Sequence, residues 1–307
     1  MSRQHWASIG ERGTLTGMLL MVHLRRLGEW PFRLVLGPVI LWYYLSHGLA
    51  RQASRDFLAR LDPALRRRPI AWRLRSLRHF FSFGQALMDK VAAWNGKHAP
   101  EALNGTGVDN FRQTFANGRG GLVLVSHHGN LDVVNAFSEQ HANLQLTVLM
   151  HTRNARKFNE LLERATGRRQ PDIMDVSELS PASAQQLDQR IRDGGFVVIA
   201  ADRIAPSEQR YRLLKFLGAE AAFPEGPFML ATLLRCPIYT LSCVREHQGF
   251  TVAFEKFDDT SSLARAERGN WIAQAMQRHA DLLADQVQRY PLQWFNFYPF
   301  WHVPEAN

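Results

Sequence analysis

Two histidines and an aspartate stand close together in the segment Ser126-His127-His128-Gly129-Asn130-Leu131-Asp132. A neutral imidazole is the side chain best suited to remove a proton near neutral pH. A nearby carboxylate can fix the tautomer of that imidazole, and the Gly129-Asn130 turn lets Asp132 fold back toward His127. We therefore expect His127 to act as a general base and Asp132 to orient it.

No nucleophile motif accompanies this pair, because the chain lacks a GxSxG elbow around Ser126. The base would then activate a hydroxyl of the substrate, and a group would be transferred directly without a covalent enzyme intermediate. Two other interpretations stay open. His127, His128 and Asp132 could be ligands in a metal-dependent hydrolase, although no further His/Asp cluster at ligand spacing completes the set. The chain could also be a non-catalytic membrane-associated adaptor.

The elements around this segment predict an α/β fold with a mainly parallel or mixed central sheet covered by helices. The run of apolar or small residues at 122–126 is typical of a buried strand, and open α/β sheets bind ligands in the loops after such strands. A second core strand, 195–201, ends at Asp202-Arg203. Phe223-Pro224-Glu225-Gly226-Pro227 predicts a helix that runs to about Leu234. Further strands are expected at 145–150, 238–244 and 250–257, and further helices at 108–117, 133–140, 153–169, 185–192 and 264–288.

The positive charge of the chain is concentrated in its first third. Residues 1–100 contain 16 Lys and Arg against 5 Asp and Glu, whereas the remainder contains 21 against 23. Such asymmetry indicates contact with a polyanion, either nucleic acid or anionic lipid headgroups. Because no RRM, KH or helix-turn-helix pattern occurs, and apolar sequence adjoins the basic residues, we expect an anionic membrane surface and no nucleic acid. An ordinary solvated basic face is the alternative.

Two apolar segments, 15–24 and 34–45, precede a basic region, 48–97, that has a helical pattern. A transmembrane helix needs roughly 20 apolar residues, which the second segment reaches only if polar residues are admitted. We favour a helical anchor in the membrane interface, where Trp42-Tyr43-Tyr44 suits the headgroup level. A single transmembrane span and a buried helix of a soluble fold remain open.

The spacing His127-x4-Asp132 resembles the HX4D signature of the lysophospholipid acyltransferase superfamily, and the flanking residues look most like its lipid A late (lauroyl/myristoyl) acyltransferase branch. Glu11-Arg12-Gly13, followed by apolar and basic segments, resembles the membrane-anchoring start of that branch. Ala201-Asp202-Arg203 falls where the family has an acidic strand-end motif, and Phe223 to Pro227 resembles its third block. The resemblance covers residues 6 to 301. It divides the chain into a helical membrane-associating region, 1–97, and an α/β acyltransferase domain, 98–307.

The resemblance implies transfer of a fatty acyl group from an acyl carrier protein or coenzyme A thioester to a hydroxyl of a lipid acceptor, of which a lipid A-like glycolipid fits best. It implies that His127 is the general base and Asp132 its orienting residue, with no cofactor beyond the thioester and no metal. The residues expected to bind substrate are Asp202, Arg203, Glu225 and Arg210.

The same resemblance implies a location at the bacterial cytoplasmic (inner) membrane, with the active site facing the cytoplasm. Cys236 and Cys243 lie in apolar sequence and agree with a reducing compartment. His128 is expected to be structural. Gly226-Pro227 follows Glu225 where glycerol-phosphate acyltransferases have Gly-Thr-Arg, which argues against a glycerolipid acceptor.

Overall fold

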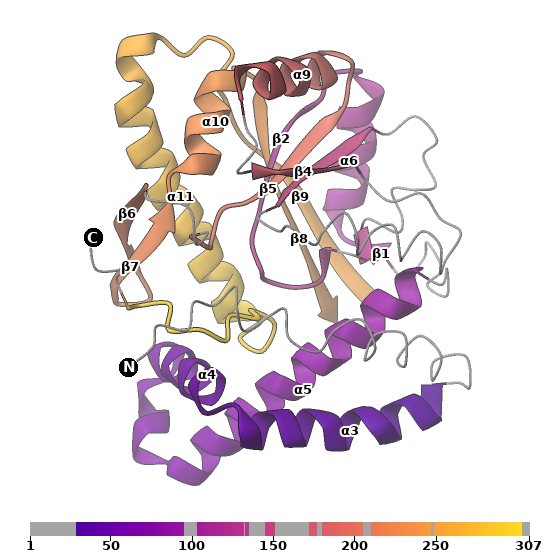
Figure 1. Ribbon diagram of the computed structural model, residues 1–307, viewed down its shortest axis with the longest axis vertical. Coiled ribbons are helices and arrows are strands. Elements are labelled where there is room, and N and C mark those ends of the chain that lie inside the picture. Colours follow the sequence, from indigo (N-terminus) through magenta and orange to yellow (C-terminus); the bar gives the residue numbers. More distant parts are fainter. Residues whose placement is uncertain are drawn as a thin grey trace.

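The computed structural model describes residues 29–94, 103–131, 133–134, 145–150, 172–176, 180–204, 210–246 and 249–302. Within these ranges, a seven-stranded sheet of order β1-β9-β8-β2-β5-β3-β4 forms the centre of the molecule, and β6 and β7 form a separate hairpin (Figure 1). Neighbouring strands of the large sheet are parallel except for β8 and β9, which are antiparallel. The strands are β1 (Leu103–Asn104), β2 (Gly121–Val125), β3 (Leu146–Met150), β4 (Asp172–Asp175), β5 (Phe196–Ala200), β6 (Tyr211–Phe216), β7 (Ala219–Pro224), β8 (Pro237–Glu246) and β9 (Gly249–Asp259). The expected mixed, mostly parallel α/β sheet is confirmed.

Helices cover this sheet, and a group of three N-terminal helices lies against the edge where the site is found (Figure 1). The N-terminal group consists of α3 (Glu29–Ser46), α4 (Gly48–Leu61) and α5 (Pro69–Trp94), with the short 3₁₀ turn η1 (Pro63–Arg67) between the last two. The others are α6 (Thr106–Ala116), α9 (Pro181–Arg192), α10 (Gly226–Leu234) and α11 (Arg268–Arg289), the last preceded by the 3₁₀ turn η4 (Arg265–Glu267).

Strand β2 is buried on both faces, as its unbroken apolar sequence predicts. Leu122 and Leu124 belong to the main core, together with side chains of α9, α10 and α11. Val123 and Val125 point to the opposite face, where they share a cluster with aromatic rings of α6. Side chains alternate between faces along a strand, so a strand covered on both sides needs an apolar residue at every position.

The N-terminal helices are joined to the main core. Phe57 and Leu58 of α4 are fully buried members of the main core cluster. Ile40 and Tyr44 of α3 pack with Phe80 of α5 in a smaller cluster. Among the described residues, no helix has the length and apolar content needed to cross a membrane. The membrane anchor therefore remains a prediction, and the apolar segment 15–24 lies outside the described residues.

The sequence did not predict β4 or the hairpin of β6 and β7. The hairpin closes through Leu217 and Gly218, which both have positive φ angles, 49° and 79°. Its second strand contains Phe223 and Pro224, and Glu225 follows as the N-cap of α10. The predicted helix of the Phe-Pro-Glu-Gly-Pro block is therefore confirmed, but its first two residues belong to a strand. The helix expected at 153–169, and all but the start of that expected at 133–140, lie outside the described residues.

Three buried histidines make the fold sensitive to acid. His79, His128 and His279 are 0%, 1% and 5% exposed, and burial lowers the pKa of each to about 4. In the unfolded chain these rings bind protons below about pH 6.5, the ordinary pKa of histidine. In the folded protein they stay neutral down to about pH 4. Their contribution to the free energy of unfolding is therefore full above pH 6.5 and falls as the pH drops from 6.5 toward 4.

We predict that His279→Phe reduces this acid sensitivity. His279 lies in α11 between the rings of Phe228 and Phe257, at centroid distances of 5.8 and 6.4 Å, so an aromatic ring fits there. Urea denaturation at pH 7.5 and pH 5 should show a loss of stability that is smaller in the variant by about 1.4 kcal/mol per pH unit below 6.5. An unchanged pH dependence would contradict the assignment.

Candidate active site

The pairing of β2 with β5 brings His127 next to Asp202. The two parallel strands are in register with a constant offset of 75 residues, from Gly121 opposite Phe196 to Val125 opposite Ala200. The Ala201 amide continues the ladder by donating to the Val125 carbonyl at 2.9 Å. Two residues beyond the end of each strand, the same offset places His127 opposite Asp202. The site therefore lies at the carboxyl edge of the sheet, where parallel sheets bind ligands.

Asp202 is fully buried and holds His127 through both carboxylate oxygens. Oδ1 lies 2.7 Å from Nδ1 of the His127 ring, and Oδ2 accepts the backbone N–H of His127 at 2.9 Å. The indole N–H of Trp294 donates to the same Oδ2 at 3.0 Å. Burial alone raises the pKa of Asp202, but His127, Arg203 and the Trp294 hydrogen bond outweigh burial and bring the pKa well below its ordinary value. Asp202 is therefore ionised at neutral pH.

An ionised carboxylate only accepts hydrogen bonds, so the His127 proton resides on Nδ1 and Nε2 keeps its lone pair. Burial and the positive charge of Arg203 lower the pKa of His127, and Asp202 opposes them; the net direction is downward. The ring is thus neutral at pH 7, and its side chain remains 36% exposed. His127 consequently has the protonation state and the access of a general base.

A tight turn after the histidines fixes the loop against β8. Gly129 has a φ of +79°, and a Cβ at this position would lie 2.0 Å from the carbonyl oxygen of Cys243. The next amide, that of Asn130, donates to the same carbonyl at 2.7 Å. Only glycine combines this close approach with a positive φ, so the turn holds the backbone of the histidine loop in one place.

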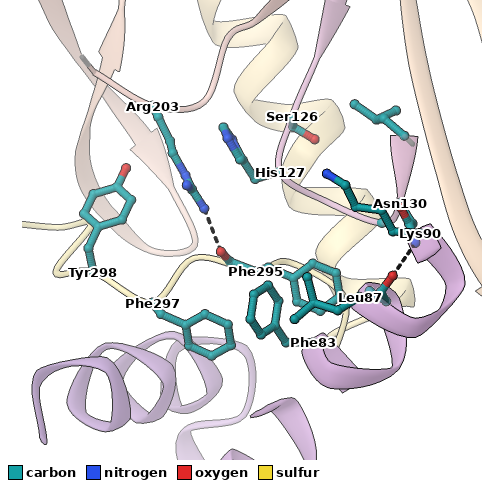
Figure 2. A pocket seen from close by; sticks show the side chains of 13 residues that line it. Phe83, Leu87, Lys90, Ser126, His127, Asn130, Arg203, Phe295, Phe297 and Tyr298 are labelled. Atoms are coloured by element: carbon teal, nitrogen blue, oxygen red, sulfur yellow. Dashed lines mark hydrogen bonds between the residues drawn. The ribbon is translucent and has the colours of Figure 1, made fainter. Parts of the chain in front are cut away.

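A cavity of about 370 Å³ opens beside His127, between the carboxyl edge of the sheet, α5 and the C-terminal segment (Figure 2). Its size is at the lower end of the range for small-molecule sites. The side chains from α5 recur every three or four residues and so share one face of the helix. The apolar lining residues are Phe83, Ala86, Leu87, Leu131, Phe295 and Phe297.

Among the described residues, two cations line the same cavity. Lys90 extends from α5 on one side of His127, and Arg203 extends from the loop after β5 on the other (Figure 2). The Arg203 guanidinium donates to the Phe295 carbonyl at 2.6 Å and lies 5.6 Å from the centre of the Tyr298 ring. An imidazole flanked by Lys90 and Arg203 beside an apolar wall suits a substrate that has both an anionic group and a hydrocarbon part.

The C-terminal segment also shapes the site, although its aromatic sequence is more typical of core packing than of its alternative, the rim of an acyl groove. Gly129 donates to the Gln293 carbonyl at 2.8 Å, and Phe295 donates to the His127 carbonyl at 3.0 Å. The aromatic tail looks like ordinary core sequence, so nothing local marks Trp294. Lys90 could have been found from its helical spacing with Phe83 and Leu87.

The structure brings only some of the predicted residues together. His127, Asp202 and Arg203 meet, whereas Asp132 lies outside the described residues, so its orienting role stays a prediction. Glu225 forms an ion pair with Arg212 in the hairpin and is not among the residues that line the cavity.

The side chains of Arg210 and His128, which the sequence also singled out, do not contact His127. Arg210 is exposed and lies 3.7 Å from the sulfur of Met229. His128 turns away from His127, and its Nε2 donates to the Tyr290 carbonyl at 3.3 Å. Within the part of the chain that the structure describes, no three His, Cys, Asp or Glu side chains are grouped so that they could hold a metal ion.

Comparison with known proteins identifies the family of this chain. The model of the bacterial lipid A biosynthesis acyltransferases matches residues 77–302, which include most of α5, the whole sheet and the C-terminal segment. A search of curated proteins finds no match. Because the family model covers well over half of the chain, this protein belongs to the bacterial lipid A biosynthesis acyltransferase family and is an acyltransferase.

Proposed function

We propose that the protein transfers a fatty acyl group from an acyl carrier protein or coenzyme A thioester to a hydroxyl of a lipid A-like acceptor, with His127 as general base. Family membership supports the acyl transfer and the lipid A-like acceptor in general terms. The contact between Nδ1 of His127 and Asp202 at the wall of the cavity is the observation that carries the assignment of the base.

The proposed reaction needs no nucleophile from the protein. Nε2 of His127 removes the proton of the acceptor hydroxyl while that oxygen attacks the thioester carbonyl carbon. The tetrahedral intermediate collapses as the carbon–sulfur bond breaks, and the imidazolium returns its proton to the departing thiolate. Asp202 stabilises the imidazolium between these two steps, and an ester and a free thiol are the products.

The cavity lining suggests where each part of the substrates lies. The apolar wall suits an acyl chain, since each buried methylene contributes about 0.8 kcal/mol. Lys90 and Arg203 suit anionic groups such as a phosphate of the acceptor or of the thioester carrier. Arg203 keeps the substrate-binding role that the sequence suggested, and Lys90 joins it.

We propose in addition that helices α3 to α5 dock on the cytoplasmic face of the bacterial inner membrane. Large apolar side chains at the surface of these helices are 41–75% exposed: Leu34, Val39, Leu41, Trp42, Leu45, Leu49, Ile70, Leu74 and Phe81. Exposed arginines accompany them: Arg66, Arg67, Arg68, Arg73 and Arg78. Apolar side chains beside cations suit the boundary between the acyl and headgroup layers of an anionic bilayer.

Substitutions of the base and of the two candidate carboxylates test the mechanism. We expect His127→Ala and Asp202→Asn each to lower kcat/KM at least a hundredfold, because the first removes the base and the second removes the acceptor at Nδ1. Assays with purified protein, an acyl thioester and a lipid A precursor measure this loss, and circular dichroism checks that each variant is folded.

Asp132→Asn is the matched comparison for Asp202→Asn. Full loss of activity in Asp132→Asn, with Asp202→Asn unaffected, would assign the orienting role to Asp132 instead. A wild-type rate for His127→Ala would refute the proposed mechanism.

Lys90→Met should raise the KM of the substrate whose anion it binds at least tenfold and leave kcat nearly unchanged, because a hydrogen bond to a charged group contributes about 1.5–3 kcal/mol. Determining KM separately for the thioester and the acceptor identifies that substrate. Lys215→Met, at an exposed position on β6, serves as the control. Unchanged KM values for both substrates would contradict the role of Lys90.

The double variant Trp42→Glu/Leu45→Glu should bind vesicles of phosphatidylglycerol and phosphatidylethanolamine at least tenfold more weakly, because burying either side chain contributes about 1.5–3 kcal/mol. Co-sedimentation measures the binding. Leu233→Glu is the matched control, since Leu233 on α10 is 59% exposed, close to the 64% of Leu45. Equal sedimentation of both variants and the wild type would refute docking through α3.

A further inference from the structure

The two carboxylate oxygens of Asp202 have different hydrogen-bond partners. Oδ1 faces the ring of His127, and Oδ2 accepts two N–H groups, from the His127 backbone and from the Trp294 indole. A carboxylate turns about its last torsion within a broad, two-fold energy profile. The two donors at Oδ2 oppose that rotation, so Oδ1 remains directed at Nδ1.

The indole of Trp294 is itself fixed from several directions. It is fully buried, and its ring centre lies 4.9 Å from Phe57 of α4, 5.4 Å from Phe216 of β6 and 4.9 Å from Phe300. Its backbone forms an antiparallel bridge with His128. The ring therefore cannot turn its N–H away from Asp202 without displacing packed aromatic side chains.

A buried polar chain holds the backbone of Trp294 as well. Nε2 of His79 lies 2.9 Å from the Trp294 carbonyl, which can only accept, so Nε2 carries the ring proton. Nδ1 of His79 then accepts the hydroxyl of Ser54 at 3.0 Å, and Ser54 accepts from Ser76 at 2.9 Å. All three side chains are 0% exposed. Helices α4 and α5 thus contribute to the placement of Trp294.

We propose that Trp294 is a positioning residue of acyl transfer, whose indole N–H locks Oδ2 of Asp202 so that Oδ1 orients the imidazole of His127. The inference rests on the proposed role of His127 as the base. Without the indole donor, the carboxylate rotates more freely and its charge is less compensated. The ring is then less well oriented, and a more basic neighbouring carboxylate makes the imidazole harder to deprotonate.

The test compares Trp294→Phe with Trp301→Phe. Both substitutions keep an aromatic ring and remove one indole hydrogen bond, but the Trp301 indole donates to the Phe216 carbonyl at 3.2 Å and not to Asp202. We expect Trp294→Phe to lower kcat at least tenfold with KM within twofold. The acid limb of the kcat/KM profile should move upward by about half a pH unit or more. Trp301→Phe should keep the wild-type midpoint.

A second variant removes the indole N–H without creating the cavity that the smaller phenylalanine ring leaves at position 294. Site-specific incorporation of β-benzothienylalanine at position 294 keeps the bicyclic shape and replaces the N–H with sulfur. Titration of the ¹⁵N-labelled histidines by NMR measures the pKa of His127 directly and should show the same upward shift.

Each outcome has a distinct meaning. A wild-type kcat and an unshifted His127 pKa in the benzothienyl variant would overturn the inference, as would equal losses without a shift in the Trp294 and Trp301 variants. Full activity of His127→Ala would instead overturn the proposed function, so the two failures are distinguishable.

Discussion

Burying the charge of Asp202 costs several kcal/mol unless hydrogen-bond donors replace the water that the carboxylate loses. Three donors come from two places in the chain: the backbone and the ring of His127, and the indole of Trp294. Each N–H donor must be held at a fixed position relative to the carboxylate, because a hydrogen bond weakens steeply when its angle departs from linearity. The register of β2 and β5, the turn at Gly129 and the path of the C-terminal segment all meet this requirement.

The same constraint ties the N-terminal helices to the site. Asn130 donates to the Ala86 carbonyl at 2.8 Å, and buried Asp89 forms an ion pair with Arg245 of β8. Helix α5 is therefore fixed to the histidine loop at its C-terminal half, while its N-terminal half exposes apolar side chains such as Leu74. At 1.5 Å per residue, Leu74 and Lys90 are roughly 24 Å apart along the helix axis. One rigid element thus connects the proposed membrane surface with the cavity.

Much of the fold could be predicted because its signals are local. The apolar runs of β2 and β5 and the Phe-Pro-Glu-Gly-Pro block each carry their own evidence within a few residues. The hairpin of β6 and β7 was missed because its strands pair only with each other and its turn, Leu217-Gly218, lacks the Asn-Gly or Asp-Gly signature.

The position of His127 could be predicted for the same local reason, since two histidines follow a buried strand. Its observed carboxylate partner was harder to identify. Asp132 is five residues from His127 in sequence, whereas Asp202 is 75 residues away and becomes its neighbour only through the strand register. Trp294, a further 92 residues along the chain, lies among aromatic residues that look like ordinary core. Long-range register and packing, not residue type, decide these contacts.

The path of the C-terminal segment determines when the site is assembled during protein synthesis. His127 and Asp202 leave the ribosome well before Trp294, and chains begin to fold from the N-terminal side during synthesis. Until the segment around Trp294 is in place, Oδ2 lacks its indole donor and the cavity lacks the wall that contains Phe295 and Phe297. A nascent chain with a finished sheet is therefore still without a complete active site until the segment that contains Trp294, Phe295 and Phe297 has been made and has packed against it.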